Sequence, residues 1–271
     1  MRNPETGSRD SSRSLGIKEK FAQVALVLLA ITTTAHAEWK VVSAESEPGR
    51  GGIEHRHVVV EDAAASQHVA VDVAVFPAKS TALRVIDNPD GQSLGAVMKR
   101  EKYVCGVNGG YFDTDFKRIG LRVADATTFS PLRRARLITG ILLQSDRGID
   151  VVRVGDFSRT KKIIAAIQSG PFLVEGNKRI RGLNDSQPAR RTFAGIATHD
   201  RALLGVCSDV SLGQLANILA TVPITADSKI RRAMNLDGGS SSAFWFVRED
   251  GGAFSISGRK PVRDFVAIVP K

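Results

Sequence analysis

The chain has 271 residues, a formal net charge of +10, 42% hydrophobic residues, 24% charged residues and only 6% aromatic residues. These values are typical of a folded globular protein and exclude a disordered or collagen-like chain. The length is enough for one large domain with a sizeable core. The cations lie in short scattered groups, which favours a solvated surface over a nucleic-acid-binding face.

The first 37 residues differ in character from the rest. Residues 1–20 are polar and basic, residues 21–31 are apolar except for Gln23, and small residues then lead to Ala35-His36-Ala37. This order is typical of a secretory signal peptide, and its apolar run is short for a membrane span. An amphipathic anchor helix is the alternative. We predict cleavage after Ala37, a periplasmic or secreted domain of residues 38–271 without a stable membrane span, and no nucleic-acid partner.

Cys105 and Cys207 both lie in apolar runs. In an oxidising compartment they can form a disulfide, and two buried free thiols are the alternative; the sequence leaves both open. His55 and His57 are spaced to share one face of a strand, as metal-binding pairs do. No third ligand lies near them in the sequence, so ordinary surface histidines are the preferred interpretation.

The sequence of residues 38–271 predicts many short strands and a few short helices. After a polar lead at residues 43–52, alternation predicts strands over residues 55–77, and residues 87–91 are typical of a turn. A helix is expected at residues 92–101, and a second one, capped by Ser211, extends to Thr221. Further strands are expected at residues 103–107, 120–123, 138–144, 150–154, 172–175, 192–197, 202–207, 233–236, 243–247 and 262–269, with a helical stretch at 161–167. This pattern predicts one mixed α/β (α+β) domain with a mixed β-sheet and a few short helices.

Three stretches depart from ordinary strands and turns. They are residues 107–113, residues 169–172 with 190–192 downstream, and residues 235–242. Paired glycines at a strand end permit positive φ and close approach of the backbone to a ligand, and the flanking Asn, Asp and Ser residues supply hydrogen-bonding groups. A serine-hydrolase triad is excluded because its histidine would follow the serine, whereas the last histidine is His199. Phosphate-loop and dinucleotide-binding motifs are absent.

The ordered set VNGGYFD (107–113), SGPFLVEGN (169–177), RTFAGI (191–196) and NLDGGSSSAFW (235–245) resembles the phosphodiester glycosidase family. That family includes the lysosomal uncovering enzyme, which removes N-acetylglucosamine from a sugar phosphodiester; many bacterial members carry only an exopolysaccharide-related label. The resemblance covers roughly residues 70–269. One departure is Ser208-Asp209-Val210, where the family commonly has Asp-Gly.

For such a substrate the leaving group is a phosphate monoester with a second pKa of about 6, so it needs little protonation. We therefore expect one essential carboxylate, Asp237, as base or as stabiliser of an oxocarbenium ion, with Arg191 as a bidentate phosphate fork and Asn108 as a third catalytic group. The neighbouring Arg190 is expected to be solvated. Expected substrate-binding residues are Gly109, Gly110, Phe112, Ser169, Gly170, Thr192, Asp209, Asn235, Gly238, Gly239, Ser240 and Ser241, the glycines through their backbone amides.

No cofactor is certain, but Ca²⁺ or Mg²⁺ is a candidate because Asp113 and Asp237 supply hard oxygen donors. The sequence thus predicts an exported hydrolase that cleaves the glycosidic bond of a sugar-1-phosphodiester of N-acetylglucosamine type in envelope or extracellular glycans. The expected partner is such a diester or an anionic envelope polysaccharide. The alternative is a non-catalytic polysaccharide-binding protein that serves exopolysaccharide assembly or export.

Overall fold

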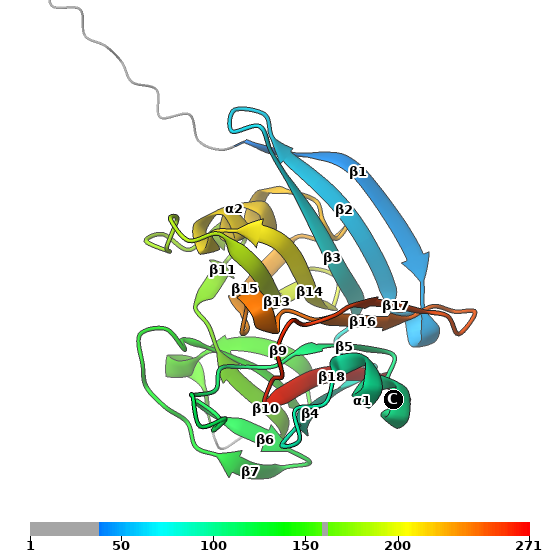
Figure 1. Cartoon of the computed structure of the whole chain (residues 1–271), viewed down its shortest axis with the longest axis vertical. Coiled ribbons are helices and arrows are strands. Elements are labelled where there is room, and N and C mark those ends of the chain that lie inside the picture. Colours follow the sequence, from blue (N-terminus) through cyan, green and yellow to red (C-terminus); the bar gives the residue numbers. More distant parts are fainter. Residues whose placement is uncertain (1–37, 159–161) are drawn as a thin grey trace, which may run out of the picture. The chain divides into compact units, whose positions relative to one another are not determined.

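A computed structural model of the protein describes residues 38–158 and 162–271 (Figure 1). The predicted signal peptide and its cleavage site lie outside the described residues. Within the described ranges, no helix has the length and apolar character needed to cross a membrane. The described residues belong to one compact unit.

The largest sheet has eight strands in the order β1-β2-β3-β14-β13-β15-β11-β12. In chain order these are β1 (Trp39–Pro48), β2 (Glu54–Asp62), β3 (Gln67–Pro77), β11 (Phe172–Glu175), β12 (Lys178–Arg179), β13 (Ala189–Ala197), β14 (Arg201–Val210) and β15 (Ile230–Asn235). β1 forms one edge; most of its residues are exposed on both faces, and its register shifts between Val41 and Ser43. The strands at the middle of the sheet are buried instead.

Two five-stranded sheets lie below the first in Figure 1. The second sheet has the order β7-β6-β10-β8-β9, formed by β6 (Arg122–Ala124), β7 (Thr127–Ser130), β8 (Gly140–Ser145), β9 (Gly148–Arg153) and β10 (Ile163–Ser169). The third has the order β17-β16-β5-β18-β4, formed by β4 (Thr81–Asp87), β5 (Cys105–Asn108), β16 (Phe244–Val247), β17 (Ala253–Ile256) and β18 (Asp264–Pro270). Strand pairs in all three sheets are antiparallel.

Two α-helices occur among the described residues, and both begin at serine caps. In α1 (Leu94–Glu101) the Ser93 hydroxyl accepts the N–H of Ala96. In α2 (Leu212–Thr221) Ser211 and Gln214 form a reciprocal capping box, which satisfies two N–H groups that the first turn leaves free. Short 3₁₀ turns are η1 (Arg50–Gly52), η2 (Val154–Asp156) and η3 (Gly239–Ser241).

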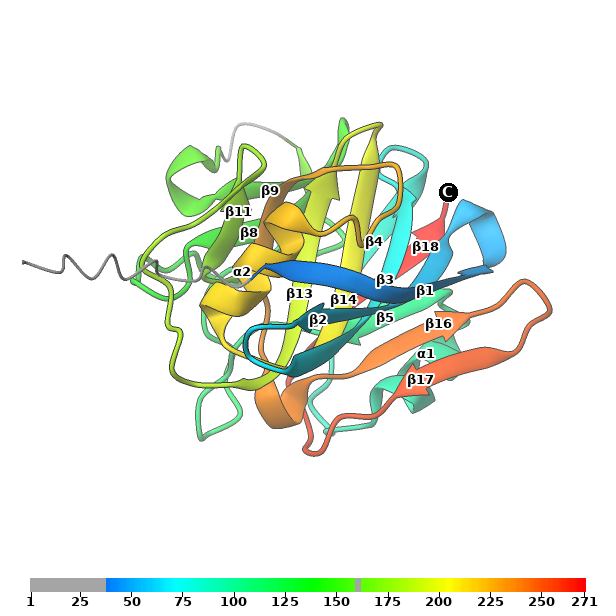
Figure 2. The ribbon, with the colours of Figure 1, turned by 90° about the horizontal axis from the view of Figure 1, so that it is seen from above.

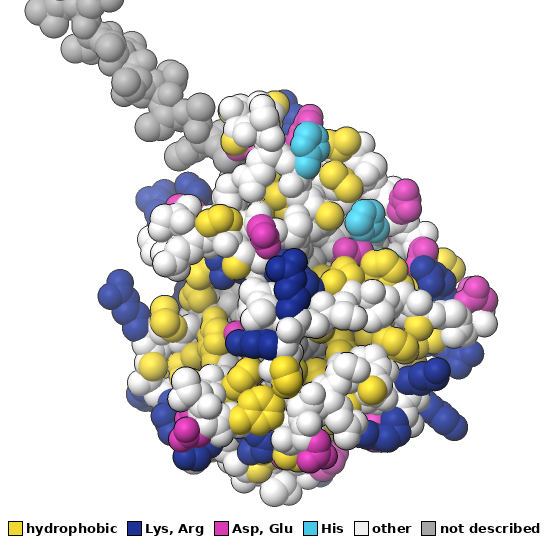
Figure 3. All heavy atoms as spheres, viewed as in Figure 1, with side chains coloured by type: hydrophobic (Ala, Val, Ile, Leu, Met, Phe, Trp, Pro, Cys, Tyr) yellow, Lys and Arg dark blue, Asp and Glu magenta, His cyan; other side chains and the backbone are white. Residues whose placement is uncertain are grey.

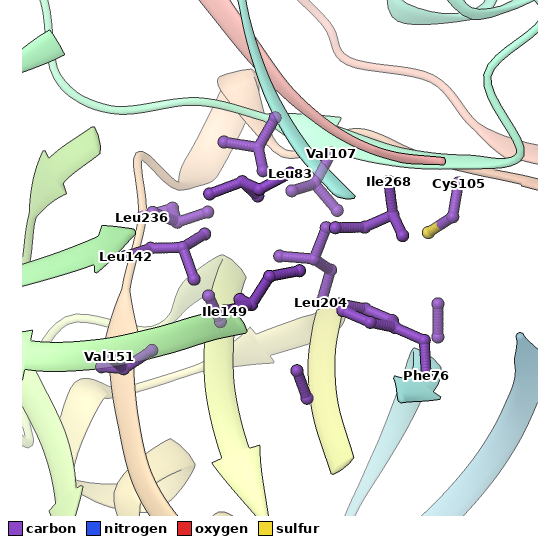
Figure 4. Close-up of a cluster of buried hydrophobic side chains, with 14 of the residues drawn as sticks. Phe76, Leu83, Cys105, Val107, Leu142, Ile149, Val151, Leu204, Leu236 and Ile268 are labelled. Atoms are coloured by element: carbon purple, nitrogen blue, oxygen red, sulfur yellow. The ribbon is translucent and has the colours of Figure 1, made fainter. Parts of the chain in front are cut away.

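The main core lies where the three sheets meet. Figure 4 shows Phe76, Leu142 and Ile268, one from each sheet, among the side chains gathered there, and all three are almost fully buried. A second cluster lies between the other face of the first sheet and α2, which crosses that sheet in Figure 2. β3 serves both clusters, because successive side chains of a strand point to opposite faces: Val73 and Val75 face α2, and Ala74 and Phe76 face the main core.

The fold corrects several expectations. The structure is β-rich, with antiparallel strand pairs in place of a mixed sheet, so the α/β class is only loosely met. The stretch predicted to be helical at residues 161–167 contributes to strand β10, which is central in its sheet and largely buried. Of the polar segment at residues 43–52, residues 43–48 form the end of strand β1, and residues 50–52 form the 3₁₀ turn η1. The capped helix at residues 211–221 and the short helix near residues 92–101 are confirmed.

Candidate active site

The three stretches singled out in the sequence converge where the first and third sheets meet. Asn235 at the end of β15 pairs with Phe193 of β13, and the N–H of Leu236 donates to Thr192 O (2.8 Å). The next N–H, that of Asp237, crosses to the third sheet and donates to Gly109 O (3.0 Å). These backbone bonds bring the segments after β5 and β15 and the start of β13 into one site.

Asn108, at the end of β5, links the three segments through hydrogen bonds of its side chain. Its amide donates to Asp237 O (2.7 Å), and its oxygen accepts from Thr192 Oγ1 (2.7 Å) and from the N–H of Ala243 (3.1 Å). Asn108 and Thr192 are both fully buried. In this structure the polar groups of both side chains are paired within the protein, and Asn108 holds the backbone of Asp237 in place; a contact of either side chain with a substrate stays a prediction.

A buried ion pair supports the two glycines after β5. Arg122 Nε donates to Asp264 Oδ2 (2.6 Å), and neither side chain is exposed. The N–H of Gly109 donates to Asp264 O (2.8 Å), and that of Gly110 to Asp264 Oδ1 (2.9 Å). A Cβ on Gly109 would lie 1.9 Å from Asp264 Oδ1, and one on Gly110 would lie 2.3 Å from Arg122 Nη2. These glycines therefore allow close packing on the ion pair. Their N–H groups were expected to bind a phosphate, but in this structure they donate to Asp264.

The Tyr111 hydroxyl links two of the converging segments. Its hydroxyl donates to Gly170 O (2.7 Å) and accepts from Asn235 Nδ2 (3.0 Å). Burial raises the pKa of Tyr111 to about 12, and the Asp237 carboxyl adds to the rise. Asn235 Oδ1 and Ser169 Oγ are buried and have no hydrogen-bond partner among the described residues. Ser169 and Gly170, both expected at the substrate, are thus covered.

The pKa of the Asp237 carboxyl departs from its ordinary value. Burial raises its pKa above the ordinary value, and the nearby Asp264 adds to the rise. The Ser241 hydroxyl, the Lys260 ammonium and the N–H of Gly238, which donates to Asp237 Oδ1 (3.0 Å), oppose it. Ser241 Oγ is itself buried and makes no hydrogen bond of regular geometry in the described part of the chain. A perturbed carboxyl at the rim of a site is typical of a proton-transfer group.

Two cationic side chains lie near the Asp237 segment: Lys260 acts on the carboxyl, and Arg191 lies beside Gly238. Arg191 donates from Nε to Val210 O (2.9 Å) and from Nη2 to Gln187 O, and the Asp209 carboxylate is among the charges that act on it. Its stem lies beside Gly238, where an added Cβ would be 3.7 Å from Arg191 Cδ. Burial lowers the pKa of Arg191. In Figure 3, Lys and Arg side chains gather at the middle of this face, where the loop from β17 to β18 crosses.

Arg190 is held rather than solvated, which corrects another expectation. Its guanidinium donates to the carbonyls of Ser242 and Ser257 and so ties the start of β13 to the loop before β18. Burial and the neighbouring Arg259 lower its pKa. The same loop presents Lys260, whose Nζ lies 5.2 Å from the centre of the Phe112 ring. Phe112 is therefore near the cations, as a residue of the site's edge.

The remaining expected residues lie apart or are exposed. Asp113 is exposed and accepts the N–H groups of Asp115 and Lys117 within its own turn. Asp209 is exposed and lines a separate hollow with Arg190 and Arg259. Across residues 38–158 and 162–271, no three His, Cys, Asp or Glu side chains are grouped to hold a metal ion. The Ca²⁺ or Mg²⁺ candidate stays a prediction. Cys105 and Cys207 are free thiols in this structure.

The sequence reasoning missed Lys260, Arg122 and Asp264. A lysine in an exposed loop carries no local signal. Arg122 and Asp264 could have been found, because each is a charged residue next to an apolar strand segment, and a charge in such a place needs a partner. Their separation of 142 residues hides which partner it is.

The fold and the site define a β-rich protein in which the Asp237 carboxyl has a raised pKa, the Lys260 charge acts on it, and Arg191 lies beside the next residue. The chain belongs to the phosphodiester glycosidase family, whose model matches residues 101–269. Its fold is similar to that of the zebrafish N-acetylglucosamine-1-phosphodiester alpha-N-acetylglucosaminidase catalytic domain, auto-inhibited by its pro-peptide (TM-score 0.57, 14% identity, 88% of this chain and 85% of that one). It is also similar to a hypothetical protein from Synechocystis (TM-score 0.56, 12% identity), of which 62% is covered by 81% of this chain. No curated protein matches the chain in sequence.

Proposed function

We propose that this protein is an exported hydrolase that cleaves the glycosidic bond of a sugar-1-phosphodiester of N-acetylglucosamine type. The observation that carries the proposal is the partly buried Asp237 carboxyl, whose pKa is raised by burial and on which the Lys260 charge acts, with the stem of Arg191 beside the next residue, Gly238. Membership of the phosphodiester glycosidase family and the substrate named for the zebrafish relative support this class of reaction. The predicted signal peptide supports export.

The two cations near Asp237 complement the negative charge of the proposed substrate. A phosphodiester carries one negative charge, and a carboxylate alone would repel it. Arg191 uses Nε and Nη2 on the carbonyls of Val210 and Gln187, and its Nη1 is the group that donates to a phosphate oxygen in this proposal. Lys260 supplies a second positive charge, which acts on Asp237. A site with these groups binds the diester and tolerates the catalytic carboxylate.

The reaction breaks the bond between the anomeric carbon and the bridging oxygen. The electron pair of that bond leaves with the phosphate, whose growing charge Arg191 and Lys260 stabilise. The Asp237 carboxylate faces the positive charge that develops on the sugar ring and then accepts the proton of the water that bonds to the anomeric carbon. The products are the free sugar and a phosphate monoester. Asn108 acts only through the backbone of Asp237, as a positioning residue.

Release of sugar from a small panel of sugar-1-phosphodiesters, including UDP-N-acetylglucosamine, tests this function. Purified protein is assayed with and without EDTA beside Asp237→Asn, which keeps the shape of the side chain but not its charge. Release that the substitution reduces by about 10²- to 10⁴-fold supports the proposal. Equal release by the variant would place the catalytic carboxylate elsewhere.

Isotope labelling separates the two ways of cleaving the diester. In ¹⁸O-labelled water, cleavage of the C–O bond puts the label into the sugar, and cleavage of the P–O bond puts it into the phosphate. Label in the phosphate would show a phosphodiesterase and overturn the proposed mechanism. No release from any diester by folded protein would favour the non-catalytic polysaccharide-binding function.

A further inference from the structure

A groove follows the outer face of the hairpin formed by β16 and β17. Trp245 pairs with Ser255 and Val247 with Ala253, so these side chains share one face. Phe244, on the opposite face, belongs to the main core. On the first face Trp245 packs against the separate cluster that includes Leu94 and Met98 of α1, whereas Val247, at the end of β16, still contacts the main core.

Helix α1 forms the other wall of this groove. Figure 2 shows α1 beside β16 and β17. Gly95, Lys99 and Lys102 follow one another at intervals of four and three residues, which puts them on the same side of the helix or at its end. Gly95 lies against Trp245, since a Cβ there would be 3.3 Å from Cζ3 of the indole ring.

Two hollows lie along the groove. One, of about 300 Å³, lies at the start of α1 and is lined by Ser241 and Lys260. The other, of about 410 Å³, lies at the end of α1 and is lined by Tyr103, Trp245 and Lys99. Because the N–H of Ser241 donates to the carbonyl of Gly238 (3.2 Å), the residue after Asp237, the first hollow adjoins the candidate active site. The second lies further along the hairpin, beyond Trp245.

The lining of both hollows has one chemical character. Arg259 and Lys260 line the first, and Arg50, Lys99 and Lys102 line the second, whereas no described Asp or Glu lines either. Cations and a partly exposed aromatic ring, that of Trp245, suit a sugar chain that carries negative charges, because ring faces pack on pyranose C–H groups and cations pair with the acids.

We infer that this groove binds an extended anionic polysaccharide whose scissile phosphodiester lies at Asp237. The inference rests on the proposed function and adds the substrate class: a polymer rather than a small diester. From residue 243 to residue 247 the strand advances roughly 13 Å, at about 3.3 Å per residue. The groove therefore accommodates sugar units beyond the one at the reacting bond.

The test uses binding, which does not depend on turnover. Trp39→Phe leaves Trp245 as the only tryptophan of a chain that has two. In that variant, oligouronates of two to eight sugars should change the indole fluorescence, with affinity that rises with chain length and falls with salt. Neutral malto-oligosaccharides of equal length should bind at least tenfold more weakly.

Matched variants locate the binding surface. Arg50→Ala with Lys99→Ala should weaken oligouronate binding by about tenfold at low salt. Lys178→Ala with Arg179→Ala removes the same charge from exposed β12, at an edge of the first sheet, and should leave binding unchanged. Equal losses of affinity in the two double variants, or equal binding of neutral chains, would overturn the proposal that the groove binds an anionic polysaccharide. Binding with the expected length dependence but without turnover of any diester would support the groove and overturn the proposed catalysis.

Discussion

At the scale of single residues, Asp237 combines a catalytic carboxyl with an unfavourable place for its charge. Burial raises its pKa in the folded protein, so the folded state holds the proton more tightly than the unfolded chain does. Ionisation therefore costs stability as the pH rises through the range between the unfolded and the folded pKa. The same raised pKa brings the carboxyl nearer to the pH at which it exchanges protons with water.

Asp237→Asn should consequently raise the melting temperature at pH 7. The amide removes the buried charge, while its oxygen can still accept the N–H of Gly238. The gain should shrink as the pH falls toward the ordinary range of Asp, because the wild-type carboxyl then becomes neutral as well. Thermal unfolding at pH 7 and pH 4 measures this. A variant that melts below the wild type at pH 7 would contradict the assignment of a destabilising charge.

Lys260→Gln should move the acid limb of the pH profile of kcat/KM to higher pH. The Lys260 ammonium lowers the pKa of Asp237, so its loss lets that pKa rise further. If the ionised carboxylate is the active form, activity is lost as the pH falls through this pKa, and the loss then begins earlier. Lys178→Gln, on exposed β12, is the control. An unmoved limb would show that Lys260 does not influence the catalytic carboxyl.

Arg191→Ala should weaken binding of a phosphodiester by roughly 10- to 100-fold, the usual cost of a lost hydrogen bond to a charged group. Binding of the free sugar should change little, because the sugar has no charge for the guanidinium to pair with. Calorimetry with both ligands gives the comparison, and Arg231→Ala removes an exposed charge as the control. Equal losses for diester and sugar would remove Arg191 from the phosphate site.

Sequence reasoning reached some residues of the candidate site and not others, for a physical reason. Asp237 and Arg191 stand in motifs whose chemistry can be argued from residue type. Asn108 stands in such a motif too, yet its amide is fully used in holding the backbone. Residue type predicts that a group can bind a ligand, whereas only the packing decides whether that group is free to do so.

At the scale of elements, the errors follow from context that local pattern does not contain. β10 has the sequence IIAAIQS, in which alanines favour a helix. The strand forms because it lies between β6 and β8, and both of its faces are covered. β1 has no buried face, so it shows no alternation of apolar and polar residues for a strand prediction to detect. The strands with one buried face and the serine-capped α2 were predictable.

The ion pair between β6 and β18 gives a prediction at this scale. Arg122→Met leaves the Asp264 carboxylate buried without its cation and should lower the free energy of unfolding by about 3–5 kcal/mol. Arg153→Met breaks the exposed pair with Glu175 and should cost less than about 1 kcal/mol. Denaturant unfolding measures both. Adding Asp264→Leu to Arg122→Met should recover part of the loss, and strictly additive losses would contradict a coupled pair.

At the scale of the whole molecule, the three sheets share one core, so we expect residues 38–271 to unfold as one unit. The two thiols report on this. Burial raises the pKa of Cys207 to about 12 and raises that of Cys105 as well. In native protein at pH 8, neither should react with iodoacetamide, and both should become reactive in one transition of the denaturant curve. Mass spectrometry of the labelled peptides measures each site. Labelling of Cys207 at a lower denaturant concentration than Cys105 would show that the first sheet unfolds separately from the third.

The exposed strand β1 has a consequence for how the protein behaves at high concentration. An edge strand of ten residues has unpaired N–H and C=O groups with which a strand of another molecule can form hydrogen bonds. In β1 this is opposed by the irregularity between Val41 and Ser43, by the acids Glu45 and Glu47, and by Pro48, which has no N–H to give. The solubility of the folded protein thus depends on a few side chains that contribute nothing to its core.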